Sequence, residues 1–304
     1  LSRHGMMRAM QASWMILASL FFATMSVCIK FASAHFHTFE LVFYRGLIGI
    51  AFMAAVCRAQ GVTLRTPIPM MHVWRSMIGV ASLATWFYAI AHLPLATAMT
   101  LNYMSGIWVA AFLIGGSLVM GQLDQVRRLG PVALAVLAGF AGVVLMLRPT
   151  WQEEQMFAGL IGLLSGIGAA MAYMQVAALG RMGEPESRTV FYFSIGTAVA
   201  GAVLSSFTTV HAWSWPAALW LIPIGVLAAL GQLCMTKAYN SGATLVVANL
   251  QYTGIIFAAL YGMTLFGDQI PATGWLGMGL IIASGIGATV LRQRTLPHAP
   301  AEEH

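Results

Sequence analysis

Long apolar stretches, each close to the length needed to cross a lipid bilayer, follow one another along most of the chain. A bilayer core about 30 Å thick needs about 20 apolar residues per helix. Breaks carrying proline, glycine or charged residues separate the stretches, and none alternates apolar and polar residues as a barrel strand would. We therefore predict an all-α membrane protein with ten transmembrane helices, at Gln11–Ala34, Phe39–Cys57, Met71–Ala91, Ala96–Met120, Leu129–Leu147, Phe157–Met182, Ser187–Thr209, Pro216–Tyr239, Ala243–Phe266 and Pro271–Leu291.

The composition agrees with a lipid environment. Hydrophobic residues make up 59% of the 304 residues and charged residues only 8%, whereas a soluble domain carries about 25% charged residues. So few charges cannot cover a surface that faces water. The net charge of +6 does not indicate nucleic acid, because the basic residues do not gather on one face. We expect membrane lipid, and no nucleic acid, around the protein.

The basic residues fall on one side of the predicted membrane. If the N-terminus is cytoplasmic, ten arginines lie in inner loops and tails, and the outer loops hold only Arg148. This distribution matches the positive-inside rule. We therefore predict that both termini are cytoplasmic and that the protein lies in a bacterial inner membrane. Two basic residues inside the spans, Arg75 and Lys237, are placed near inner helix ends.

The two halves of the chain resemble each other at an offset of about 147 residues. Asn102 corresponds to Asn249, and Gly130 corresponds to Gly277. Five spans per half is an odd number, so the second half must enter the membrane from the opposite side. Inverted repeats of this kind are common in secondary transporters, whose substrate site lies where the repeats meet. We predict two five-helix repeats, at residues 11–147 and 157–291.

Several motifs resemble the drug/metabolite transporter superfamily of the EamA type. They are Trp14, Lys30 and Phe43-Tyr44-Arg45 in the first half, and Lys237-Ala238-Tyr239, Gly242-Ala243-Thr244, Asn249-Leu250-Gln251-Tyr252 and Leu265-Phe266-Gly267-Asp268 in the second. The resemblance covers nearly the whole chain. It implies a ten-helix carrier that exports amino acids or other small metabolites, as YddG-like amino-acid exporters do.

The acidic residues argue against one kind of exporter. All nine lie in predicted loops, tails or helix ends. A carboxylate within the membrane is the usual proton carrier and cation site, and the small four-helix multidrug relatives of the family have a glutamate in their first span that this chain lacks. A proton-coupled cation or drug exporter is therefore only the alternative to an amino-acid exporter. A permease for another metabolite, such as a nucleobase or vitamin, is a further alternative.

Amides and aromatic rings within the spans are the candidate substrate contacts. An unpaired amide in hydrocarbon is costly, so Asn102 and Asn249 must face protein or water, either as contacts between helices or as substrate ligands. A cavity of rings and amides without fixed charge suits amphipathic zwitterions such as apolar amino acids. The cavity candidates are Trp86, Tyr88, Asn102, Tyr103, Trp108, Tyr173, Gln175, Asn249, Gln251 and Tyr252.

Four charged residues are candidate gates. Lys30, Glu40 and Arg45 cluster near the predicted outer face. They serve either as interfacial anchors, with a Glu40–Arg45 pair, or as an outer gate. Lys237, at the predicted inner end of the eighth span, either follows the positive-inside rule or lines the inner mouth.

The remaining reactive residues indicate no further chemistry. Cys28, Cys57 and Cys234 are far apart and form no CxxC motif, so we expect small buried apolar residues. His35 and His37 are placed in an exposed turn, and no metal or cofactor is expected. An enzyme would need clustered catalytic groups that no motif supplies. Glycine-rich helix faces serve either internal packing or a homodimer.

Overall fold

Helices make up the architecture of the chain. The computed structural model describes residues 3–121, 130–147, 153–209, 211, 215–240 and 250–295. Over these residues the helices are α1 Arg3–Ala32, α2 Thr38–Ala59, α3 Pro69–His92, α4 Leu95–Asn102, α5 Ser105–Val119, α7 Gly130–Leu147, α8 Glu153–Arg181, α9 Glu186–Ser205, α10 Trp215–Ala218, α11 Leu221–Asn240, α13 Thr253–Leu265 and α14 Ala272–Thr295.

Many of these helices are suited to a membrane. Of the residues that the structure describes, 5 helices are long and apolar enough to cross a bilayer: Ser13–Ala32, Thr38–Ala59, Gln155–Arg181, Glu186–Ser205 and Trp215–Asn240. Shorter apolar helices lie at Gly130–Leu145, Thr253–Leu265 and Ala272–Gly287. The all-helical, apolar character follows the expectation from the sequence, whereas the count of ten spans and the side of the termini stay predictions.

The fourth predicted span is not one helix, and here the expectation of a continuous Ala96–Met120 helix is wrong. α4 ends at Asn102, Tyr103 and Met104 form a turn, and α5 begins at Ser105. A similar turn at Gln251 and Tyr252 directly precedes α13. The sequence contains no proline or glycine at either turn. Interrupted helices are tolerated at membrane depth where protein buries them or where they line a cavity.

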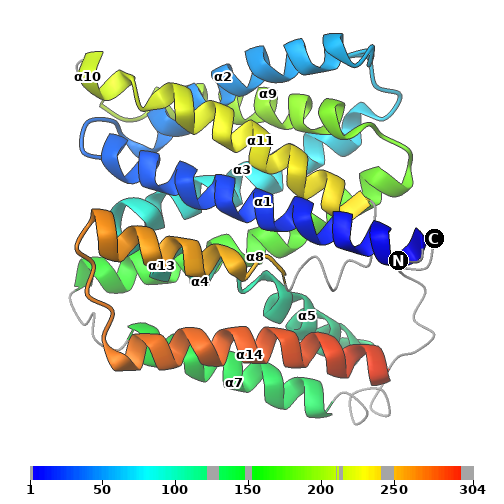
Figure 1. Ribbon diagram of the computed structural model, residues 1–304, viewed down its shortest axis with the longest axis vertical. Helices are drawn as coiled ribbons and strands as arrows, with labels where there is room; N and C mark the ends of the chain where they lie inside the picture. Colours follow the sequence, from blue (N-terminus) through cyan, green and yellow to red (C-terminus); the bar gives the residue numbers. More distant parts are fainter. Residues whose placement is uncertain are drawn as a thin grey trace.

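Helices from the two halves of the chain pack against each other in pairs. α2 lies along α9, α1 along α11, α3 along α8 and α7 along α14, while α4 contacts α13. In Figure 1 the α7–α14 pair forms the lower edge of the bundle, and α1, α2, α9 and α11 lie together in its upper part. The core is therefore shared between the halves. α1 begins and α14 ends at the same end of the bundle (Figure 1).

Two glycines allow the close crossing of α2 and α9. A Cβ added to Gly46 would collide with the backbone of Ala198, and one added to Gly201 would lie 2.5 Å from the Cα atom of Phe43. Helices in lipid gain little from the hydrophobic effect, so such close backbone packing is a main source of their association. The glycines here serve contacts within the chain.

Candidate functional site

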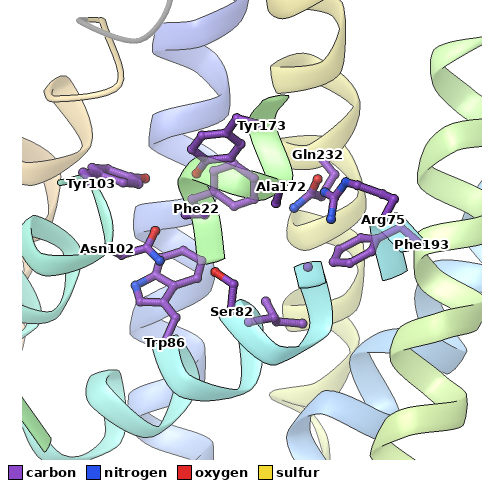
Figure 2. A pocket seen from close by; sticks show the side chains of 13 residues that line it. Phe22, Arg75, Ser82, Trp86, Asn102, Tyr103, Ala172, Tyr173, Phe193 and Gln232 are labelled. Atoms are coloured by element: carbon purple, nitrogen blue, oxygen red, sulfur yellow. The ribbon is translucent and has the colours of Figure 1, made fainter. Parts of the chain in front are cut away.

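A pocket lies between helices of both halves of the chain (Figure 2). Its cavity volume is about 40 Å³. α1, α3, α4, α8, α9 and α11 form its wall, together with the turn after α4. The lining residues are Phe22, Arg75, Gly79, Ser82, Leu83, Trp86, Asn102, Tyr103, Ala169, Ala172, Tyr173, Phe193 and Gln232.

Asn102 both lines the pocket and joins helices. As the last residue of α4, it donates from Nδ2 to Ser165 Oγ on α8 at 3.1 Å. Ser82 Oγ on α3 donates to the carbonyl oxygen of Ser165 at 2.8 Å. This set of bonds fixes the break after α4 against two other helices. Asn102 is therefore both a contact between helices and a part of the cavity wall.

Aromatic rings form one part of the wall. Trp86 packs edge-on against Phe22, with ring centroids 6.1 Å apart, and lies 6.5 Å from the Tyr103 ring. The Trp86 Nε1 and Tyr103 hydroxyl groups are buried and have no hydrogen-bond partner in the part of the chain that the structure describes. Buried polar groups normally have one. These two are available to a bound solute.

Tyr173 is held in place from behind. Gln251 donates from Nε2 to the Tyr173 hydroxyl at 2.8 Å, and the Tyr173 ring stacks on Tyr239 at 5.5 Å. Gln251 is only 2% exposed and does not line the pocket itself. Through this bond the turn before α13 contacts the pocket wall.

The pocket contains a fixed charge, which corrects the expectation of an uncharged cavity. Arg75, in the second turn of α3, is 3% exposed, and its guanidinium lies 4.2 Å from the centre of the Phe193 ring. The sequence assigned Arg75 to the inner end of its helix. An ionisable residue inside a predicted span is a functional candidate by default, and that signal identifies Arg75. Phe193 is a further lining residue that was not predicted, and Gln232 lines the pocket as well.

Tyr252 and Trp108 were predicted to line the cavity, but neither lines this pocket. The Tyr252 hydroxyl fills the space beside Gly285 of α14, and the Trp108 ring packs edge-on against Phe140 of α7 at 5.1 Å. Both rings face the α7–α14 pair. They stabilise the packing of that pair against α5 and the start of α13.

Of the three remaining candidates, two lie elsewhere. Tyr88 stacks on His92 at 4.1 Å near the end of α3, and Gln175 on α8 is outside the lining of the pocket. Asn249 lies outside the described residues. Of the predicted cavity residues, the structure thus brings together Trp86, Asn102, Tyr103 and Tyr173 around one hollow, with Gln251 behind it.

Lys30 connects three segments at the end of α1. It donates to the carbonyl oxygen of Leu93 at 2.8 Å and lies 4.0 Å from Asp268 Oδ2. Asp268 also accepts from the backbone N–H of Leu95 at 3.2 Å. We call these contacts the Lys30 network. It joins α1 and the start of α4 to the segment between α13 and α14.

The other gate candidates do not join this network. Glu40 accepts from the backbone N–H of His37 at 2.6 Å and contacts His211 Nδ1 at 3.0 Å. Arg45 donates to Thr197 Oγ1 at 3.3 Å, so the expected Glu40–Arg45 pair is not formed. Lys237 lies 4.5 Å from the ring of Trp14, which links α11 to α1.

A second charged cluster, which the sequence does not reveal, surrounds Glu184 between α8 and α9. Glu184 accepts from Arg188 Nε at 2.6 Å and bonds His72 Nε2 at 2.8 Å. Arg188 also donates to the carbonyl oxygens of Thr63 and Arg65. Burial alone would raise the pKa of Glu184, but hydrogen bonds from Arg188, His72 and Thr66 lower it overall. We call this group the Glu184 cluster.

Comparison with known proteins gives the following matches. No protein-family model matches the sequence. A pseudopaline exporter from Pseudomonas aeruginosa is 32% identical over 272 residues, which cover 88% of this chain and 91% of the exporter. A riboflavin transporter from Rhizobium johnstonii is 25% identical over 285 residues, covering 90% of this chain and 89% of the transporter. A solved crystal structure shares the fold, with a TM-score of 0.67 and 18% identity over 94% of this chain and 99% of that chain.

Proposed function

We propose that this chain, which belongs to the drug/metabolite transporter superfamily, exports amino acids or chemically similar small metabolites across the bacterial inner membrane by alternating access. The chain matches a pseudopaline exporter and a riboflavin transporter over nearly their whole length. The pocket is the proposed substrate site. The observation that carries the proposal is the position of this pocket, at an interrupted span and between helices of both halves.

The packing of the helices supports an inverted repeat. If the second half repeats the first upside down, α1, α2, α3 and α7 correspond to α8, α9, α11 and α14. The α1–α11 contact then corresponds to the α8–α3 contact, and α2–α9 and α7–α14 each correspond to themselves. All of these pairs are in contact. In such folds the substrate site lies where the repeats meet, at discontinuous helices.

Alternating access needs a closure at each end of the pocket, and the two charged groups supply candidates. The Lys30 network joins α1 and α4 to the segment after α13. The Glu184 cluster joins the α2–α3 loop and α3 to the segment between α8 and α9. Each crosses between the halves. In the proposed cycle one group breaks while the other is intact, so the pocket opens to one side at a time.

Counterflow into proteoliposomes tests this function. The panel contains the twenty amino acids together with pseudopaline and riboflavin, the solutes named for two relatives. We expect flux of at least one solute and a decrease of roughly tenfold in Asn102→Ala, because that change removes a polar wall group and the anchor of the interrupted span. Asn240→Ala, outside the pocket, is the matched control. Absence of flux for every solute would refute the proposal.

A further inference from the structure

We propose that Arg75 binds a carboxylate of the substrate, so that the pocket accepts small organic anions with an apolar or aromatic body. The inference rests on the proposed function, since it names the chemistry of the solute that the pocket would carry. It also covers zwitterions, whose carboxylate would take the same position, and it disfavours the export of cations.

The Arg75 guanidinium is buried without an anionic partner. It is 3% exposed, and its Nε and Nη1 atoms have no hydrogen-bond acceptor among the described residues. A guanidinium carries five N–H donors and a permanent charge. Leaving such a charge buried and unpaired is costly. An arginine that only held helices together would be expected to have acceptors around it.

Among the residues that the structure describes, no carboxylate pairs with Arg75. None of the residues that line the pocket is acidic. The described carboxylates that form ion pairs have other partners: Asp268 pairs with Lys30, Glu40 with His211, and Glu184 with His72 and Arg188. The anion that complements Arg75 must therefore come from outside the described chain.

The surroundings of Arg75 position the guanidinium for a ligand. Its face lies against Phe193 at 4.2 Å, a cation–π contact that orients the group but occupies none of its N–H donors. Gly79, one turn further along α3, leaves room for the group, because a Cβ there would collide with Arg75 Nη1. A planar guanidinium can bind a carboxylate through two parallel hydrogen bonds.

A second arginine increases the positive charge at this end of the pocket. Arg45 on α2 is also 3% exposed, and its guanidinium lies 5.3 Å from the centre of the same Phe193 ring. Arg45 does not line the pocket, and Thr197 accepts one of its hydrogen bonds. Two buried positive charges near one ring favour an anion in the adjacent hollow and repel a cation.

The opposite end of the pocket has different chemistry. Figure 2 shows Arg75, Gln232 and Phe193 together on one side, and Trp86, Asn102 and Tyr103 on the other. A solute that placed its carboxylate at Arg75 would bring its body against rings and the Asn102 side chain. We therefore expect an amphipathic molecule to bind here in one orientation, once the pocket opens to admit it.

Probes with and without a carboxylate test the inference. Proteoliposomes with wild-type protein are assayed with L-phenylalanine, 3-phenylpropionate and L-phenylalaninamide, alongside the solutes of the counterflow panel. We expect transport of carboxylates, with the amide at least roughly tenfold weaker. In Arg75→Gln the preference for the carboxylate should fall by roughly 10- to 100-fold, the range typical of a charge-assisted hydrogen bond. Arg75→Lys should keep part of it, and Gly79→Ala should lower it by displacing the guanidinium.

The controls separate binding from folding. Arg58→Gln removes an exposed arginine outside the pocket and should leave the preference unchanged. Because the readout is the ratio of two probes in the same vesicles, a general loss of folded protein does not alter it. Transport of neutral or cationic solutes without any carboxylate would overturn the inference and leave the proposed function standing. An unchanged ratio in Arg75→Gln would also overturn it. Absence of all transport would refute both.

Discussion

Two arginines of this protein lie in opposite electrostatic situations. Arg188, in the Glu184 cluster, donates to both oxygens of Glu184 and to two backbone carbonyls. Arg75, in the pocket, touches an aromatic ring, and two of its nitrogens lack an acceptor among the described residues. A paired charge stabilises the resting structure, whereas an unpaired one is available to a ligand. Arg188 therefore belongs to a proposed closure of the pocket, whereas Arg75 is the proposed binding group.

The largest expected effect follows from removing the partner of the paired charge. Glu184→Ala leaves Arg188 and His72 without their carboxylate, and breaking a buried pair typically costs about 3–5 kcal/mol. Arg75→Gln removes an unpaired charge and should leave stability unchanged or slightly higher. Thermal unfolding in detergent micelles measures both variants. If Arg75→Gln lost as much stability as Glu184→Ala, Arg75 would be a structural residue and the distinction would fail.

The stability contributed by the Glu184 cluster should depend on pH, because its carboxylate is paired. The folded-state pKa of Glu184 is lowered from 4.5. Because the ionised form is favoured in the folded state, its contribution is present above 4.5 and is lost as the pH falls through the lowered value. We expect the unfolding temperature to drop when the pH falls below 4.5. This drop should be smaller than the decrease in unfolding temperature that Glu184→Ala causes at neutral pH. The drop should be smaller in Glu184→Gln. An equal drop in both proteins would show that another group is responsible.

A smaller effect is expected behind the pocket wall. Gln251→Leu and Tyr173→Phe each remove the bond between these side chains, a neutral hydrogen bond typically worth about 0.5–1.5 kcal/mol. Each should weaken transport by roughly two- to tenfold, and the double variant should be no worse than the stronger single one. Initial rates of counterflow measure this. Fully additive losses would show that the two residues act independently.

The smallest expected effect concerns the Lys30 network. Lys30 and Asp268 are 4.0 Å apart and partly exposed, and such pairs typically contribute about 0.2–1 kcal/mol. Asp268→Asn should raise access from that side to a cysteine at position 232 by roughly two- to fivefold. Labelling rates of Gln232→Cys, in a background where Cys28, Cys57 and Cys234 are serine, measure this. An unchanged rate would show that the network is no gate.

The helices were largely predictable because long apolar runs follow from the thickness of the bilayer. The turn at Tyr103 was not, because neither proline nor glycine marks it, and contacts such as Asn102 with Ser165 fix it only in the folded chain. The internal repeat, with its corresponding asparagines, still led to this segment. The twin residue Asn249 lies outside the described residues, so its part in the site stays a prediction.

The charged residues were harder to place, since their partners are distant in the sequence. Lys30 meets Asp268, and His72 meets Glu184, through tertiary packing that a single sequence does not encode in its spacing. Arg75 does lie near a helix end, as predicted, but its place in the pocket wall was missed for another reason. The positive-inside rule accounts for any arginine near an inner helix end. It does not say whether the side chain faces lipid, water or the interior of the protein. Its burial beside Phe193 appears only in three dimensions.

A crystal structure with bound 4-iodo-L-phenylalanine would show whether Arg75 holds the carboxylate of a bound solute. The iodine atom can be located by its anomalous signal, and the account predicts it near the rings of Trp86 and Tyr103, with the carboxylate about 3 Å from the Arg75 guanidinium. Iodine outside the pocket, or a carboxylate turned away from Arg75, would contradict the account.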